Sequence, residues 1–221
     1  MSLLKKELMR FVKIFLGFLS CSLGCVVILK SNLGLAPWDV LHQGVSMVTG
    51  ITIGQASITL GVIIVLMDIF LGQPIGIGTV LNFIFIGIFI DMIIYLNFIP
   101  TFDNMYMRVI ELLVGIFFYT YGTYLYMIQG MGCGPRDGFM QILTKRFNQP
   151  VSVIKNGIEV MAFVLGWLLG GKLGIGTIIT ALSMGFLLQL MFRMGDINIK
   201  KLQHRSIKEE IVHLGRVFRG F

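Results

Sequence analysis

The sequence contains one pattern of residues twice, displaced by 98 positions and without a net gap. The residues that recur are mostly glycine, proline, aspartate and threonine, which set the geometry of the backbone, whereas the apolar residues between them differ. The clearest correspondences are Gly34, Pro37 and Asp39 with Gly132, Pro135 and Asp137, and the turn 76–79 with the turn 174–177. What is repeated is therefore the path of the chain. In a membrane protein, such a duplication is the usual construction of a transporter or channel, with its site at the interface of the repeats.

The composition is that of a membrane protein. Hydrophobic residues make up 56% of the chain and charged residues 13%, and the mean hydropathy is +0.86. Charge is absent from residues 75–90 and limited to one glutamate in residues 109–134, which is typical of transmembrane helices. The basic start and the apolar run after it resemble a signal peptide. However, Gly17 and Gly24 in that run recur as Gly115 and Gly122, so we expect a retained first helix and close helix packing at these glycines.

Each repeat predicts three long helices and one short helix. In the first repeat, residues 1–98, the long helices are 11–29, 54–71 and 79–95, and the short one is 37–48. In the second repeat, residues 99–195, they are 109–127, 151–169 and 177–194, with a short helix at 135–147. At about 1.5 Å per residue, a short helix covers less than ~20 Å of a hydrocarbon core of roughly 30 Å. We therefore expect an all-α membrane protein in which each short helix is re-entrant and turns back inside the membrane.

Three crossings per repeat place the second repeat upside down relative to the first. With six crossings, fifteen of the 18 lysines and arginines fall on the side of both termini, which by the positive-inside rule is the cytoplasm. Eight crossings with parallel repeats give the same charge count. The shortness of 37–48 and 135–147 favours six crossings and inverted repeats.

The motifs resemble those of the YczE/YitT-type family of small bacterial membrane proteins. The resemblance rests on Gly34-x-x-Pro37-Trp38-Asp39, on its counterpart Gly132-x-Gly134-Pro135-Arg136-Asp137, and on the two Gly-Ile-Gly-Thr turns, and it extends over residues 11–193. It implies a multi-pass protein of the bacterial plasma membrane and implies no particular chemistry.

The two short helices give the sharpest prediction of a site. The N-terminus of a half-helix directs unpaired N–H groups and a partial positive charge into the protein, which suits anions and carbonyl oxygens. We expect a small anionic or carboxylate-bearing solute between the two N-termini, with Arg136 as the fixed positive charge. The alternatives are that Asp39 and Asp137 only cap their helices, and that Arg136 pairs with Asp137 or Glu159 or points to the cytoplasm. The predicted site comprises Ala36, Pro37, Trp38, Asp39, Gly132, Gly134, Pro135, Arg136 and Asp137.

Four further residues within the predicted spans are candidates for function. Tyr121 and Tyr124, three apart on one helix, are expected to line a polar cavity. Glu159 and Asp91 lie deep in their helices, where ionisable groups are expensive and often mark proton or ion pathways, although Glu159 also suits a static pair with Arg136 or Lys155. The sequence shows no nucleophile–base pair that would indicate an enzyme. It also shows no Cys/His spacing that would indicate a metal site, and it predicts no other cofactor.

The tail, residues 196–221, reads as a separate amphipathic helix on the inner leaflet, held by anionic lipid. Apolar residues recur at helical spacing among basic ones: Ile207, Ile211, Leu214, Phe218 and Phe221, with Arg205, Lys208, Arg216 and Arg219. The tail carries a net charge of +3 out of the +7 of the chain, and a basic tail at a membrane surface does not indicate a nucleic-acid partner. The sequence as a whole predicts a transporter or channel-like permease, with an accessory or scaffold protein of the membrane as the alternative. A homo-oligomer is compatible with either.

Overall fold

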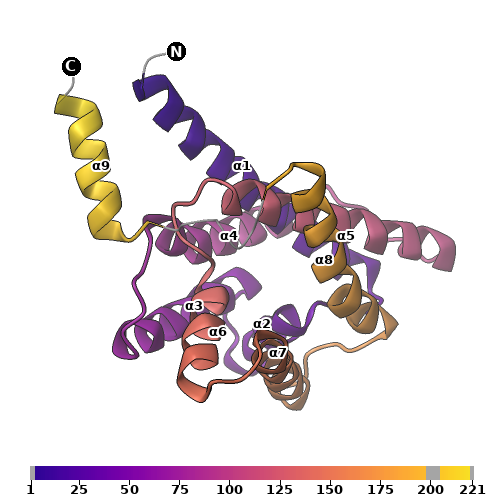
Figure 1. The fold of residues 1–221 in the computed structure, drawn as a ribbon. Helices are drawn as coiled ribbons and strands as arrows, with labels where there is room; N and C mark the ends of the chain where they lie inside the picture. Colours follow the sequence, from indigo (N-terminus) through magenta and orange to yellow (C-terminus); the bar gives the residue numbers. More distant parts are fainter. Residues whose placement is uncertain (1–2, 198–204, 220–221) are drawn as a thin grey trace.

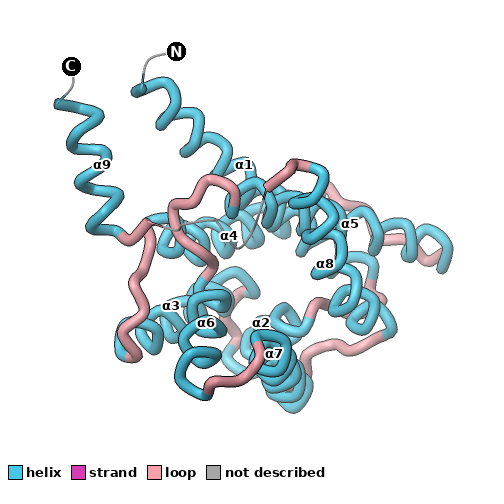
Figure 2. Tube along the Cα trace, in the orientation of Figure 1, coloured by secondary structure: helices cyan, strands magenta, loops and turns pink. Residues whose placement is uncertain are grey.

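The computed structural model describes residues 3–197 and 205–219, and in these residues the chain forms nine helices and no strand (Figures 1 and 2). The helices are α1 (Leu3–Ser31), α2 (Pro37–Thr49), α3 (Ile53–Phe70), α4 (Ile77–Leu96), α5 (Met105–Met127), α6 (Pro135–Phe147), α7 (Val151–Leu168), α8 (Ile175–Met194) and α9 (Ile207–Arg219). All eight helices predicted in the two repeats are present within a few residues of their expected bounds, except that α1 begins earlier, at Leu3. The all-helical prediction is confirmed.

Six of these helices, among the described residues, are long and apolar enough to cross a membrane: α1, α3, α4, α5, α7 and α8. The helices α2 and α6 have 13 residues each, which at about 1.5 Å per residue gives roughly 20 Å, shorter than a bilayer core. Proline at the first turn starts both short helices, since its fixed φ suits a helix and its missing N–H costs nothing there. Glycine or asparagine in the left-handed region ends them, at Gly50 and Asn148.

The two repeats are joined along α1 and α5, which pack at the paired glycines. A Cβ on Gly24 would lie 2.6 Å from the carbonyl oxygen of Gly115, and a Cβ on Gly17 would lie 2.9 Å from that of Gly122. Such distances leave no room for a side chain, so the predicted close packing is confirmed. The later glycine of α1 meets the earlier glycine of α5 and the reverse, so the two helices run antiparallel.

The two Gly-Ile-Gly-Thr turns, 76–79 and 174–177, each form a hydrogen bond to the other repeat. The N–H of Gly78 donates to the carbonyl oxygen of Met131 at 2.7 Å, and the N–H of Gly176 donates to that of Leu33 at 2.8 Å. Beside these bonds, Gly34 and Gly132 have φ angles of 117° and 135°, which favour glycine. The turn of one repeat thus supports the loop that precedes the short helix of the other repeat.

Two arginines at counterpart positions, Arg10 and Arg108, form further hydrogen bonds between the two repeats. Arg10 donates to the carbonyl oxygen of Gln129 at 2.7 Å, just beyond the end of α5. Arg108 donates to that of Ser31 at 2.7 Å, at the end of α1, and to Asn32. A cation at a helix C-terminus satisfies unpaired carbonyls and complements the helix dipole.

In Figure 2, α4 and α8 lie on the side of α1 and α5, and α3, α6, α2 and α7 lie on the opposite side. Helix α4 packs on α1 and α8 on α5, while α3 packs on α4 and on α6, and α2 packs on α7. The short helices are held by an apolar cluster that includes Trp38, Leu41, Ile64, Phe139 and Ile158. One neighbouring pair differs from its counterpart, because α3 packs along α4 whereas α7 and α8 scarcely touch.

The tail helix α9 lies beside the start of α1 (Figure 1). Glu210 is fully buried and forms ion pairs with Arg10 at 3.4 Å and Arg205 at 3.3 Å. His213 lies 3.0 Å from a carboxylate oxygen of Glu7. Hydrogen bonds from the hydroxyl and backbone N–H of Ser206 hold the pKa of the exposed Glu209 carboxylate below its ordinary value.

In the tail predicted as 196–221, the helix begins at Ile207, the first apolar residue of the predicted pattern, and the residues just before it bind the body of the protein. The N–H of Arg205 donates to Gly130 at 3.0 Å, and that of Ile207 donates to Ile75 at 2.9 Å. Ile211 and Val212 are exposed, and the contact of this helix with lipid stays a prediction. Residues 198–204, Phe221 and the side chains of Arg216, Phe218 and Arg219 lie outside the described part.

We expect Glu210→Ala to release α9 while the membrane helices remain folded. The substitution leaves the partly buried Arg10 without its partner in α9, and breaking a buried ion pair costs about 3–5 kcal/mol. Limited proteolysis of the purified protein should cut the tail faster in this variant. Lys208→Ala, at an exposed position on the same helix, is the matched control, and equal cleavage rates for the two variants would contradict the anchoring role of Glu210.

Candidate functional site

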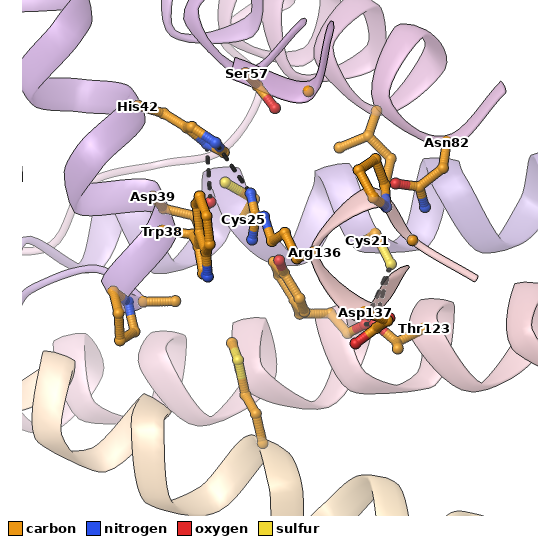
Figure 3. Close-up of a pocket in the computed structure, with 18 of the residues that line it drawn as sticks. Cys21, Cys25, Trp38, Asp39, His42, Ser57, Asn82, Thr123, Arg136 and Asp137 are labelled. Atoms are coloured by element: carbon orange, nitrogen blue, oxygen red, sulfur yellow. Dashed lines mark hydrogen bonds and ion pairs between the residues drawn. The ribbon is translucent and has the colours of Figure 1, made fainter. Parts of the chain in front are cut away.

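A cavity of about 230 Å³ lies in the middle of the protein, and residues from each of α1 to α8 line it (Figure 3). Pockets for drug-sized ligands are roughly 300–1,000 Å³, so this cavity suits a smaller molecule. Its lining includes nine of the residues singled out in the sequence: Ala36, Pro37, Trp38, Asp39, Gly134, Pro135, Arg136, Asp137 and Glu159.

Both short helices begin at this cavity. Helix α2 starts at Pro37 with Asp39 in its first turn, and α6 starts at Pro135 with Asp137 in its first turn. In neither helix does the side chain of the preceding residue cap the N-terminus. The structure thus brings together the two motifs that lie 98 positions apart in the sequence.

Arg136 lies over the ring of its counterpart Trp38 in this cavity. The guanidinium carbon of Arg136 lies 4.6 Å from the centroid of the Trp38 ring. A guanidinium over an indole face is held by a cation–π interaction, which strengthens where water is excluded. The arginine is therefore positioned from the opposite repeat.

His42 connects Arg136 to Asp39. Nη2 of Arg136 lies 3.0 Å from Nε2 of His42, and Nδ1 of His42 lies 3.3 Å from Oδ1 of Asp39 (Figure 3). Arginine has only donors, so Nε2 must accept and the proton of a neutral imidazole is on Nδ1, facing Asp39. The second contact meets the distance of an ion pair but lacks the geometry of a hydrogen bond. The three side chains form one polar chain, from a cation through a neutral ring to a carboxylate.

The other carboxylate oxygen of Asp39 is an acceptor without a partner. Asp39 is 3% exposed, and its Oδ2 makes no hydrogen bond within the described part of the chain. A buried polar atom without a partner costs about 1–3 kcal/mol. Asp39 lines the cavity, so a donor on a bound molecule would satisfy it.

The sequence missed His42 and several neutral polar groups of the cavity. The counterpart of His42 is Met140, so the repeat gives no signal for the histidine, although its spacing of three from Asp39 places both on one helix face. The other polar lining residues missed are Cys21, Cys25, Ser57, Asn82, Tyr119, Thr123, Tyr126 and Thr180.

Tyr121 and Tyr124, predicted to line the cavity, lie away from it. Tyr121 is 40% exposed and stacks on Phe117, and Tyr124 packs edge-on against Phe192. The glycine face of α5 is turned toward α1, and the tyrosines that share the cavity side are Tyr119 and Tyr126. Their spacing of seven, equal to that of Gly115 and Gly122, is a signal that could have identified them.

Three other predicted residues have separate positions. Glu159 lines the cavity beside Lys155, with 3.8 Å between the carboxylate and ammonium. Asp91 lies outside the cavity and accepts hydrogen bonds from the backbone of Gly54 and from the hydroxyl of Thr52, at the start of α3. Gly132, in the loop before α6, lies against Thr79 and is not part of the cavity lining. Among the described residues, no three His, Cys, Asp or Glu side chains gather as metal ligands.

Comparison with known proteins agrees with this picture. An uncharacterized protein of Haemophilus influenzae is 35% identical over 182 residues, which is 82% of this chain and 81% of that protein. The uncharacterized membrane protein YczE of Bacillus subtilis is 34% identical over 190 residues, 84% of this chain and 87% of its own length. The uncharacterized protein YyaS of the same organism is 27% identical over 191 residues, covering 82% and 92% of the two chains. No solved structure matches the chain.

These similarities confirm the resemblance that the motifs indicated and agree with the six apolar helices in making this a membrane protein. The model of one protein family, described as a family of unknown function (DUF6198), matches residues 8–193. The matched region covers nearly all of both repeats and contains both short helices and every residue of the cavity. The chain therefore belongs to the DUF6198 family.

Proposed function

We propose that this protein is a permease for a small, carboxylate-bearing solute, which binds in the central cavity between the N-termini of α2 and α6. The observation that carries the proposal is the set of charged side chains gathered around a cavity among apolar spanning helices. Ionisable groups at membrane depth are expensive and are typical of transport pathways. A scaffold protein has no need of such a cavity.

Inverted repeats are supported by the antiparallel packing of α1 and α5. If both helices cross the bilayer, they cross it in opposite directions, and each repeat begins with one of them. The repeats also form equivalent hydrogen bonds in both directions. Gly78 of the first repeat donates to Met131 of the second, and Gly176 of the second donates to Leu33 of the first. Such a pseudo-two-fold relation is the usual construction of secondary transporters.

A re-entrant path of α2 is supported by the contacts at its two ends. Helix α1 ends beside the end of α4, where Lys30 donates to Asn97 at 2.7 Å. Helix α2 then starts at the central cavity, and α3 follows its end beside Asp91, in the later half of α4. The chain thus enters from one end of the bundle and returns to the same end. The positive-inside bias assigns both termini to the cytoplasm.

Arg136 is the cationic group at the centre of the cavity that suits a carboxylate. His42 contacts one nitrogen of this guanidinium, Nη2, and the cation–π contact with Trp38 helps to hold the group in place. A planar guanidinium binds a carboxylate through paired hydrogen bonds. The partial positive charges at the starts of α2 and α6 add to the same attraction.

A screen of ligand-induced stability tests this function. Purified protein is heated in detergent with a panel of amino acids, carboxylates, phosphates and uncharged polar metabolites. A solute at ~100-fold above its Kd stabilises the folded state by about 2.7 kcal/mol, so a bound compound raises the melting temperature. We expect a carboxylate-bearing compound to do so, and proteoliposomes to accumulate it in labelled form.

The main competing function is an accessory role beside another membrane system. Co-purification of a stoichiometric partner, together with the lack of both a stability shift and flux across the whole panel, would replace the permease with that role. Flux of an uncharged compound alone would retain transport and overturn the carboxylate specificity.

A further inference from the structure

We infer that solute enters and leaves the cavity between α7 and α8, through an opening whose rim carries Lys155 and Glu159, while the equivalent seam between α3 and α4 is closed. This inference rests on the proposed function, because it assigns the route to the site proposed above. It also assigns a role to two charged residues that the Arg136 site does not use.

The seam between α3 and α4 is packed without space. A Cβ on Gly54 would lie 2.5 Å from the carboxyl carbon of Asp91, and a Cβ on Gly61 would lie 2.5 Å from the Cβ of Phe83. The carboxylate of Asp91 further ties α4 to the start of α3 through the backbone N–H of Gly54 at 2.8 Å. Glycines on one helix, large or charged groups on the other and a hydrogen bond therefore hold these helices together.

The counterpart seam between α7 and α8 lacks each of these features in its sequence. Gly54 is replaced by Ser152 and Gly61 by Glu159, so α7 has side chains where α3 has glycine. On α8, Ala181 replaces Phe83 and Gln189 replaces Asp91. The two helices scarcely touch. The difference between the two seams therefore follows from the sequence, since the counterpart positions on α7 and α8 have no groups that could close this seam in the same way.

The cavity reaches the surface at this seam. Of the residues that line it, the two that are exposed are Lys155 on α7 and Ala181 on α8. Asp39, Cys25 and Asn82, which line it from other helices, are buried. The ammonium of Lys155 extends across the gap, to 3.8 Å from where a Cβ of Gly185 would lie.

The rim presents one charge of each sign. The side chain of Lys155 is 48% exposed and that of Glu159 is 31% exposed, and their charged groups are 3.8 Å apart. A contact this long and this exposed opens at little cost. Lys155 can therefore attract an anionic group and Glu159 a cationic group of a passing solute, before Arg136 binds the carboxylate in the centre.

Labelling of a native cysteine, Cys25, tests this route and does not require the solute to be identified. The chain has three cysteines, and replacing Cys21 and Cys133 with serine leaves Cys25, which lines the cavity and is 3% exposed. The purified variant in lipid nanodiscs is treated with an anionic sulfonatoethyl and a cationic trimethylammonioethyl methanethiosulfonate. Mass spectrometry gives the rate of disulfide formation, in which the thiolate displaces sulfinate from the reagent.

Ala181→Trp should block labelling of Cys25 by both reagents, because the indole fills the gap from an exposed position that needs no repacking of the core. Leu182→Trp, on the adjacent lipid-facing position that is 73% exposed, is the matched control and should label at the parent rate. Size-exclusion profiles and melting temperatures verify that both variants are folded.

The rim charges are tested with the same two reagents. Lys155→Gln should slow the anionic reagent, and Glu159→Gln should slow the cationic reagent, each by about fivefold, because a unit charge at ~4 Å contributes about 1 kcal/mol in water. Equal labelling of the two tryptophan variants, charge variants without effect, or no labelling of the parent protein would each overturn the route. None of these outcomes depends on flux, so the route and the permease function fail separately.

Discussion

Replacing Arg136 with glutamine lowers the affinity for the carboxylate-bearing solute by roughly 10- to 100-fold, since a hydrogen bond to a charged group contributes about 1.5–3 kcal/mol. Glutamine keeps a polar group but is shorter, carries no charge and cannot form the paired hydrogen bonds of a guanidinium. It also loses the cation–π contact with Trp38. Isothermal titration of the compound found in the stability screen measures the change.

Two further variants separate charge from geometry at this position. Arg136→Lys retains the positive charge and loses the planar guanidinium that stacks on Trp38, so its affinity should be intermediate. Arg146→Gln removes an exposed arginine from the last turn of the same helix and should bind as the parent does. Unchanged affinity in Arg136→Gln, with folding intact, would exclude the proposed carboxylate contact.

Replacing Gly24 with alanine should strongly destabilise the helix pair that joins the repeats. The added methyl group would lie 2.6 Å from the carbonyl oxygen of Gly115 and against the backbone of Tyr119. Backbone cannot move aside as a flexible side chain does, so α1 and α5 must separate. Overpacking of this kind costs about 1–3 kcal/mol and sometimes more. A lower melting temperature in detergent is the expected result.

Gly157→Ala is the matched control for that experiment. Gly157 lies within α7, and a Cβ added there meets nothing within 4 Å. Alanine in a helix interior is favoured over glycine by about 0.5–1 kcal/mol, so this variant should melt at or above the parent temperature. If the two alanine variants melt together, close packing at Gly24 does not hold α1 and α5.

The helices themselves were predictable because their ends are marked in the sequence. Pro37 and Pro135 start the short helices. Gly50 and Asn148 end them in the left-handed conformation, which few residues other than glycine and asparagine adopt at low cost. The long helices follow from continuous apolar runs. These signals are local, so they act on the chain before any tertiary contact is made.

The tyrosines of α5 show where local signals end. Residues 119, 121, 124 and 126 all lie on one helix at 3.6 residues per turn, and their relative directions follow from the sequence. Which of these directions faces the cavity depends on the rotation of α5 about its axis. Close packing of Gly115 and Gly122 on α1 fixes that rotation, and it selects Tyr119 and Tyr126.

The sequence by itself determined the number of helices, their bounds and the two equivalent loops, because glycine and proline restrict the backbone wherever they occur. Only the tertiary structure decided which charges act together. Arg136 lies over Trp38 and beside His42 because residues from opposite repeats converge there. It also decided that the α3–α4 seam is closed and the α7–α8 seam is open. Side chains at counterpart positions differ in size and charge, and packing between helices depends on the volume of both partners.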